Sequence, residues 1–155
     1  MEIGKKNPQK KVNGKNLKIA IILPYFNEKL GLELLANAKN ELIKNNVQEK
    51  NITVIRVAGA LEIPFACKKI IEKSRVKPNT IIALGVVIRG ETSHFELVTN
   101  TTYQGLMKVQ LDTGIPISFG ILACENIEQA KKRVSKGREA AQAALLQTLL
   151  SLQKL

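Results

Sequence analysis

The sequence predicts an α/β fold: a three-layer αβα sandwich in which helices cover both faces of a four-stranded parallel sheet. Short apolar runs of strand length alternate with longer segments of helical periodicity, four times along the chain. This repeated order favours parallel strands joined by right-handed crossovers. The length of 155 residues and the hydrophobic content of 45% fit one soluble domain, and no linker interrupts the pattern.

The predicted strands are short runs rich in Ile, Val and Leu. The first, LKIAIIL, is almost entirely apolar and stops at Pro24, as expected for a strand buried on both faces. The second is rich in β-branched residues, and the third ends in seven apolar or small residues. The four predicted strands span residues 17–23, 51–57, 80–88 and 115–123.

The predicted helices lie between these strands and after the last one. In the first helix, apolar residues recur at four-residue steps, the stripe of an amphipathic helix. Pro64 falls in the first turn of the second helix, where its missing N–H does no harm. The last helix contains the Ala-rich run REAAQAALLQTLLSL. The four helices span residues 28–46, 63–74, 93–110, ending before Asp112, and 127–152, with a break near 135–137.

The net charge and the first residues of the chain indicate where the protein is located and what kind of ligand it attracts. We expect residues 1–11, with Pro8 and four lysines, to form a basic flexible arm, and residues 12–155 to form a single domain. The first sixteen residues have no apolar core of a secretory signal, and no apolar run approaches the roughly 20 residues that span a bilayer, so we expect a cytoplasmic protein. The net charge of +11 predicts attraction to anions, without choosing among nucleic acid, acidic lipid and phosphorylated metabolites.

The two cysteines and the single histidine do not form a metal-binding pattern. Cys67 and Cys124 lie in separate apolar segments, and His94 cannot complete a zinc site with them. We therefore expect two reduced thiols in the core and no metal site.

Candidate functional residues follow the strands, because ligands of parallel sheets bind beyond the carboxyl ends of the strands. In the segment RGETSHFE, Ser93 and Glu96 have the spacing of a capping box that would begin a helix at His94. The amino end of that helix would attract an anion, and Gly90 would let the backbone approach it closely. His94 is either a proton-transfer residue or a residue that helps to cap the helix.

Two other loops carry residues with open roles. Phe26, after Pro24, is either a rim residue of the core or a face on which a planar ring stacks. Glu62, between Leu61 and Ile63, either caps a helix or accepts hydrogen bonds from ligand hydroxyls.

Taken together, several stretches resemble the lumazine synthase family over nearly the whole chain from about Leu17 onward. The combination of GxLEIP, GVVIRGxTxHFE and FGxLxxENxEQAxxR, in this order and spacing, is highly specific. The matching stretches are YFN, GALEIPFACKK, ALGVVIRGETSHFELV, QGL, PISFGILACENIEQAKKR and KG.

The resemblance implies a flavodoxin-like fold and an enzyme of riboflavin biosynthesis. Family enzymes condense 5-amino-6-(D-ribitylamino)uracil with 3,4-dihydroxy-2-butanone 4-phosphate to give 6,7-dimethyl-8-ribityllumazine, phosphate and water. They use neither metal nor cofactor, and they assemble from pentamers whose active sites lie between subunits. The alternatives are a non-catalytic relative that binds flavin-like rings or forms shells, and a protein that binds nucleic acid through its basic arm. With the enzyme as the first hypothesis, we expect neither a nucleic acid nor a membrane as a partner.

The resemblance also assigns roles to individual residues. His94 would transfer protons, and Phe26 would stack on the pyrimidine. The residues implied to hold the ribityl chain are Ala60, Leu61 and Glu62, and those implied to line the ring site are Val86, Val87 and Ile88. The phosphate would be held by the backbone of Glu91 and Thr92 and by the side chains of Arg133 and Lys136. Phe119 and Arg133 would come from the adjacent chain.

Overall fold

The computed structural model describes residues 12–153, so the predicted basic arm of residues 1–11 lies outside the described part of the chain. The strands are β1 (Ile19–Pro24), β2 (Ile52–Val57), β3 (Thr80–Ile88) and β4 (Ile117–Cys124). The helices are α1 (Glu28–Lys44), α2 (Ile63–Lys73), α3 (His94–Thr113), α4 (Ile127–Lys131) and α5 (Lys136–Leu152). Two short 3₁₀ turns, η1 (Glu49–Asn51) and η2 (Ala60–Glu62), precede β2 and α2.

The four strands form one parallel sheet, as predicted, and their order is β2-β1-β3-β4. The central strand β1 is buried at every position, and seven of the nine residues of β3 are buried, which explains their unbroken apolar sequences. The last residues of neighbouring strands pair with each other: Pro24 with Val57, and Ile88 with Cys124. The carboxyl ends of all four strands therefore lie at the same end of the sheet, which we call its carboxyl edge.

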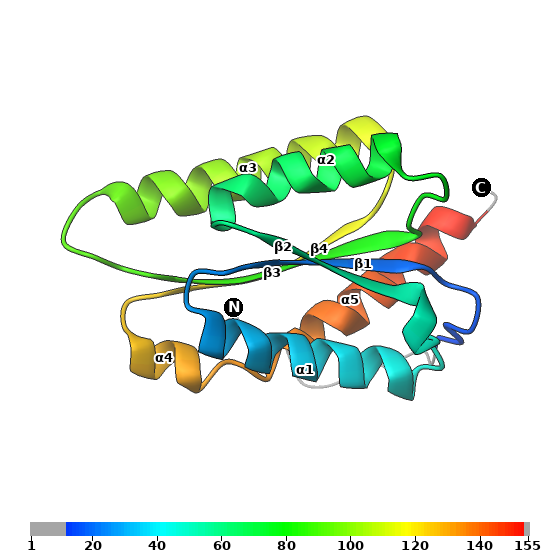
Figure 1. Ribbon diagram of the computed structural model, residues 1–155, viewed down its shortest axis with the longest axis horizontal. Helices are drawn as coiled ribbons and strands as arrows, with labels where there is room; N and C mark the ends of the chain where they lie inside the picture. The colour runs from blue at the N-terminus through cyan, green and yellow to red at the C-terminus, as the bar shows by residue number, and fades with distance from the viewer. Residues whose placement is uncertain (1–11, 154–155) are drawn as a thin grey trace.

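Helices cover both faces of the sheet, which confirms the three-layer sandwich (Figure 1). Helices α2 and α3 lie side by side on one face, and α1, α4 and α5 lie on the other. Each face has its own apolar core: one cluster joins the sheet to α1 and α5, and the other joins it to α2 and α3. Strands β2 and β4 are the two edges of the sheet.

The predicted helix ends lie within two residues of the observed ones, except at the end of α3 and at the break in the final helical region, where the predictions were wrong. Helix α3 continues through Asp112 to Thr113, because the left-handed residue that ends it is Gly114, at φ 70°. The Thr113 hydroxyl donates to the Val109 carbonyl at 2.7 Å, which keeps the last turn helical. The break in the final helical region spans residues 132–135, slightly earlier than predicted, and α5 begins at Lys136.

Helix α5 packs directly against the backbone of α1 at Gly137. A β-carbon placed on Gly137 would lie 2.1 Å from the Leu34 carbonyl oxygen and 3.2 Å from the Ala38 amide nitrogen. Both neighbours are backbone atoms of α1, which cannot turn aside as a side chain can. Glycine at this position therefore sets the distance between the two helices.

The cysteine prediction is confirmed: Cys67 and Cys124 are both free and buried. Burial raises the pKa of the Cys67 thiol to about 12, so this thiol stays protonated and packs as an apolar group. Within residues 12–153, no cluster of His, Cys, Asp or Glu side chains could hold a metal ion. No helix in the same range is long and apolar enough to cross a membrane.

Candidate active site

A cavity of about 370 Å³ lies at the carboxyl edge of the sheet, among the loops that follow β1, β2 and β3. Its floor is the end of β3, Val86 to Ile88, and residues 58–62 form one wall. Phe26, in the loop after β1, and His94, the first residue of α3, also line it. Its size and its mostly apolar lining suit a small planar molecule with a few polar groups.

The loop that carries Phe26 is held in a sharply defined shape. Asn27 adopts the left-handed conformation at φ 53°, which asparagine tolerates better than most residues. Its side-chain amide donates to the Val86 carbonyl at 2.8 Å, which ties the loop to β3. The Phe26 ring is 73% exposed, so it is not part of the core and is available as a stacking surface.

Arg56 fastens the same loop from the edge strand β2. Its guanidinium donates to the Leu23 carbonyl at 3.1 Å and to the Glu28 carboxylate at 2.9 Å. It also lies 4.2 Å from the centre of the Tyr25 ring, at the distance of a cation–π contact. Arg56 thus contacts the turn between β1 and α1 both before Phe26, at Leu23 and Tyr25, and after it, at Glu28.

Glu62 closes the turn between β2 and α2. One of its carboxylate oxygens accepts a hydrogen bond from the Gly59 N–H at 2.8 Å, which fulfils the predicted capping role locally. The side chain remains exposed and lines the cavity beside Ala60 and Leu61. Its capping bond fixes the carboxylate in a position from which it can also accept hydrogen bonds from a ligand.

The predicted capping box at the start of α3 was wrong. The Ser93 hydroxyl makes no capping bond, and the Glu96 carboxylate is bound by Arg89 instead. The His94 N–H donates to the Thr92 hydroxyl at 3.3 Å. Arg89 offers the carboxylate a full positive charge as well as a hydrogen bond, whereas a capping box offers it only an uncharged backbone N–H.

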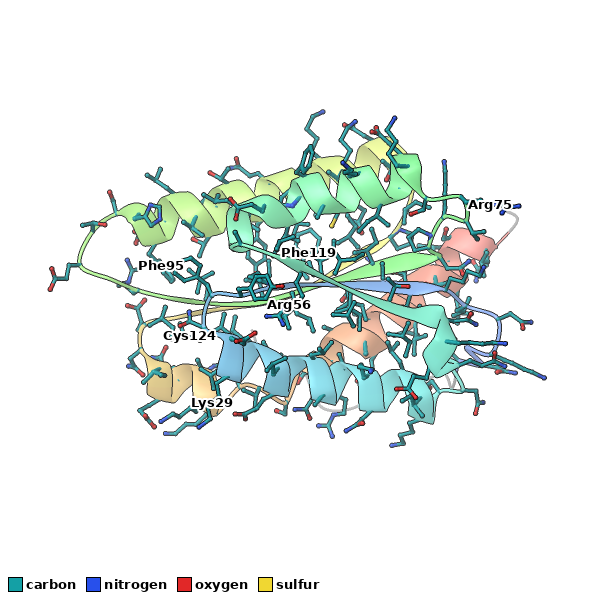
Figure 2. All side chains as sticks on the ribbon, in the orientation of Figure 1. Lys29, Arg56, Arg75, Phe95, Phe119 and Cys124 are labelled. Carbon is teal, nitrogen blue, oxygen red and sulfur yellow. The ribbon has the colours of Figure 1, made fainter. Side chains whose placement is uncertain are left out.

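Arg89 anchors the base of the loop between β3 and α3. Besides Glu96, it binds the Glu125 carboxylate at 2.7 Å, and its guanidinium carbon lies 4.3 Å from the centre of the Phe95 ring. Figure 2 shows Phe95 and Cys124 at the same end of the molecule, where β3 and β4 end. The hydrogen bond from Arg89 holds the pKa of Glu96 below its usual value.

A second cavity, of about 760 Å³, lies along β4 between α3 and α5. Phe119 lines it and packs edge-on against Tyr103, with 5.5 Å between the ring centres. The Tyr103 hydroxyl donates to the Ile121 carbonyl at 2.8 Å, and burial raises the pKa of this phenol. Arg133 and Lys136 line the same cavity.

The chain thus divides its predicted site residues between two places. The first cavity brings together Phe26, Ala60, Leu61, Glu62, Val86, Val87, Ile88 and His94. Phe119, Arg133 and Lys136 lie in the second. Glu91 and Thr92 are exposed on the loop between β3 and α3.

Sequence reasoning missed three residues that shape the first cavity: Asn27, Arg56 and Arg89. An asparagine directly after Pro24-Tyr25-Phe26 is a recognisable signal of a left-handed turn. Arg56 gave no local signal, because its carboxylate partner Glu28 lies 28 residues away. Arg89 pairs with Glu96, seven residues on, and with Glu125, 36 residues on, and the spacing of Glu96 predicts a capping box instead.

The fold and the cavity define a flavodoxin-like α/β protein with a small-molecule site at the carboxyl edge of its sheet. The sequence profile of the family described as 6,7-dimethyl-8-ribityllumazine synthase matches residues 16–151. A 6,7-dimethyl-8-ribityllumazine synthase from Paracidovorax citrulli (strain AAC00-1) is 46% identical over 136 residues, which cover 87% of each chain. The chain belongs to the 6,7-dimethyl-8-ribityllumazine synthase family.

Proposed function

We propose that this protein is a 6,7-dimethyl-8-ribityllumazine synthase of riboflavin biosynthesis. It condenses 5-amino-6-(D-ribitylamino)uracil with 3,4-dihydroxy-2-butanone 4-phosphate, and it releases phosphate and water. The observation that carries the proposal is the gathering of Phe26, Glu62 and His94 around one cavity beyond the ends of three strands. Phe26 can stack on a planar ring, Glu62 can accept hydrogen bonds from a polyol, and His94 can accept and return protons.

Within this proposal, the residues of the first cavity bind the aminouracil. Phe26 stacks on the pyrimidine, which uses the exposed ring that Asn27 and Arg56 hold in place. The ribityl chain lies along Ala60, Leu61 and Glu62, and the ring rests on Val86, Val87 and Ile88. His94, at the first turn of α3, moves the protons required for imine formation, loss of phosphate and ring closure.

The phosphate needs positive charge that the loop of one chain does not supply. Between Ile88 and Glu96 the only Lys or Arg is Arg89, and two carboxylates already engage it. We propose that Glu91 and Thr92 offer backbone N–H groups, while Arg133 and Lys136 of an adjacent chain supply the cations. Phe119, which lines the same second cavity, would come from that chain as well.

This division of residues supports a homo-oligomer built on pentamers, with each active site between two subunits. A heterologous contact, in which the first cavity of one chain faces the second cavity of the next, generates a ring when the rotation between neighbours closes, and five subunits are the ring that we propose. We propose further that the enzyme works without metal or cofactor, since protons and a leaving phosphate are all that the reaction requires it to handle. Two free buried thiols support a cytoplasmic location, where thiols stay reduced.

The proposal is tested by incubating the purified protein with both substrates near neutral pH and following the absorbance and fluorescence of the lumazine product. We expect product to form in the absence of any added metal or cofactor. Binding of a lumazine without turnover would instead identify a non-catalytic relative. Absence of both turnover and binding, with authentic substrates, would refute the proposed function.

The shared site is tested by mixing two defective variants, His94→Ala and Arg133→Ala. After dissociation and joint reassembly in equal amounts, a random arrangement restores intact residues in about a quarter of the interfaces. We expect the mixed assembly to be more active than the mean of the two variants treated alone, because about a quarter of its sites have both residues intact. No gain, with mixed assemblies verified by mass, would mean that each site lies within one chain.

A further inference from the structure

The turn between β1 and α1 presents the Phe26 ring without burying it. The ring is 73% exposed, so packing contacts alone do little to fix its position. A β-carbon placed on Gly59 would lie 3.7 Å from the Cδ2 atom of this ring and 3.1 Å from the Glu62 carboxylate, so the ring and the carboxylate both lie beside Gly59. The place of the ring relative to the carboxylate therefore depends on the backbone of the turn.

Arg56 holds this backbone from the edge strand β2. Its Nε donates to the Leu23 carbonyl at 3.1 Å, and its Nη2 donates to the Pro24 carbonyl at 3.4 Å and to the Glu28 carboxylate at 2.9 Å. Its guanidinium carbon also lies 4.2 Å from the centre of the Tyr25 ring. One planar side chain thus contacts the turn at four residues, as the fixed fork of an arginine allows and a lysine does not.

The strand that carries Arg56 also leads into the turn that carries the carboxylate. The Val57 carbonyl accepts a hydrogen bond from the Tyr25 N–H at 2.8 Å, and Gly59 and Glu62 follow in the next turn. Arg56 therefore joins the ring-bearing turn to the start of the carboxylate-bearing turn. A ligand that stacks on the ring and also bonds to the carboxylate needs both at a fixed separation, and ordering a loose turn on binding would weaken its affinity.

We propose that Arg56 is a positioning residue that holds the Phe26 ring at the distance from the Glu62 carboxylate that the aminouracil requires, without touching the aminouracil itself. The inference rests on the proposed function, because it concerns a substrate of that reaction. Within the described part of the chain, the lining of the first cavity does not include Arg56. The Asn27 amide still ties the turn to the Val86 carbonyl at 2.8 Å, so loss of Arg56 loosens the turn and does not unfold it.

The experiment compares Arg56→Met with the wild-type protein. We expect the KM for the aminouracil, and the Kd of the fluorescent lumazine product, to rise about two- to tenfold, the effect of ordering one or two side chains on binding. The KM for the butanone phosphate and kcat should change much less. Arg75→Met is the control, since it removes the same charge at the opposite end of the molecule from Phe95 and Cys124 (Figure 2), and it should leave both KM values unchanged. An unchanged aminouracil KM in Arg56→Met, or an equal rise for both substrates, would overturn the proposal.

Removing the ring makes the test decisive. In Phe26→Ala there is no ring to position, so Phe26→Ala/Arg56→Met should bind the lumazine within about twofold of Phe26→Ala alone. If Arg56→Met weakens binding by the same factor with and without the ring, Arg56 acts by another route and the proposal is wrong. Arg56→Lys serves if Arg56→Met does not fold: it keeps a charge for Glu28, and it should give a smaller effect that Phe26→Ala again abolishes. Failure of the wild-type protein to form product counts against the proposed function, whereas an effect that does not depend on the ring counts against Arg56 alone.

Discussion

Replacing His94 with alanine is expected to lower kcat by between a few-fold and about a hundredfold, as loss of a proton-transfer group does. His94 is exposed at the mouth of the first cavity, and no other histidine is present in the chain to replace it. The hydrogen bond that His94 makes to Thr92 comes from its backbone N–H, so alanine retains it. Steady-state kinetics with each substrate varied in turn measures the effect.

Thermal unfolding of the same variant separates catalysis from capping. We expect His94→Ala to melt within about 1–2 °C of the wild type, because an exposed first-turn side chain contributes little to stability. His94→Gln, which keeps a polar side chain that cannot take up a proton, should be about as slow as the alanine variant. A normal rate in both variants, or slowing that simply follows loss of stability, would assign His94 to the helix end and not to the chemistry.

Replacing Gly137 with alanine is expected to destabilise the protein strongly. The added β-carbon would lie 2.1 Å from the Leu34 carbonyl oxygen, so α5 and α1 must move apart. Overpacking of this kind typically costs about 1–3 kcal/mol and sometimes more. For a chain of this size we expect Tm to fall by about 2–4 °C for each kcal/mol, which calorimetry or circular dichroism would record.

Gly90 provides the matched control, because a β-carbon placed there meets no atom within 4 Å. We expect Gly90→Ala to leave Tm nearly unchanged, whatever it does to phosphate binding. Gly137→Ala has a second effect: Lys136 precedes it, so a displaced α5 also moves the proposed phosphate cation. An unchanged Tm in Gly137→Ala would mean that the contact between α1 and α5 is looser than the structure has it.

Much of the fold could be predicted from the sequence because its strongest signals are local. Buried parallel strands are continuous apolar runs, and the helices between them have a clear apolar stripe. The end of α3 was misjudged because Asp112 and Thr113 are weak helix formers, whereas the glycine that ends the helix follows them at Gly114. Only the position of the left-handed residue decides that boundary.

The site was predicted unevenly, for a physical reason. Residues that line the first cavity follow strands directly, so sheet geometry alone brings them together. The interactions that shape the loops come from residues far apart in sequence, such as Arg56 with Glu28 and Arg89 with Glu125. The capping box failed although Arg89 and Glu96 are only seven residues apart: local spacing allows Ser93 and Glu96 to pair, but the fold places Arg89 where it binds the Glu96 carboxylate.

The direction of the sheet also determines where the chain can be altered safely. Because all four strands run the same way, every residue proposed to touch a substrate lies towards their carboxyl ends or along β4 and the helices beside it. The turn between α2 and β3, with exposed Arg75, Val76 and Lys77, lies at the opposite end. A peptide tag or fluorescent label inserted there could affect folding or assembly, but it would not contact the proposed substrate site. That turn is therefore a suitable attachment point for following the protein without disturbing its chemistry.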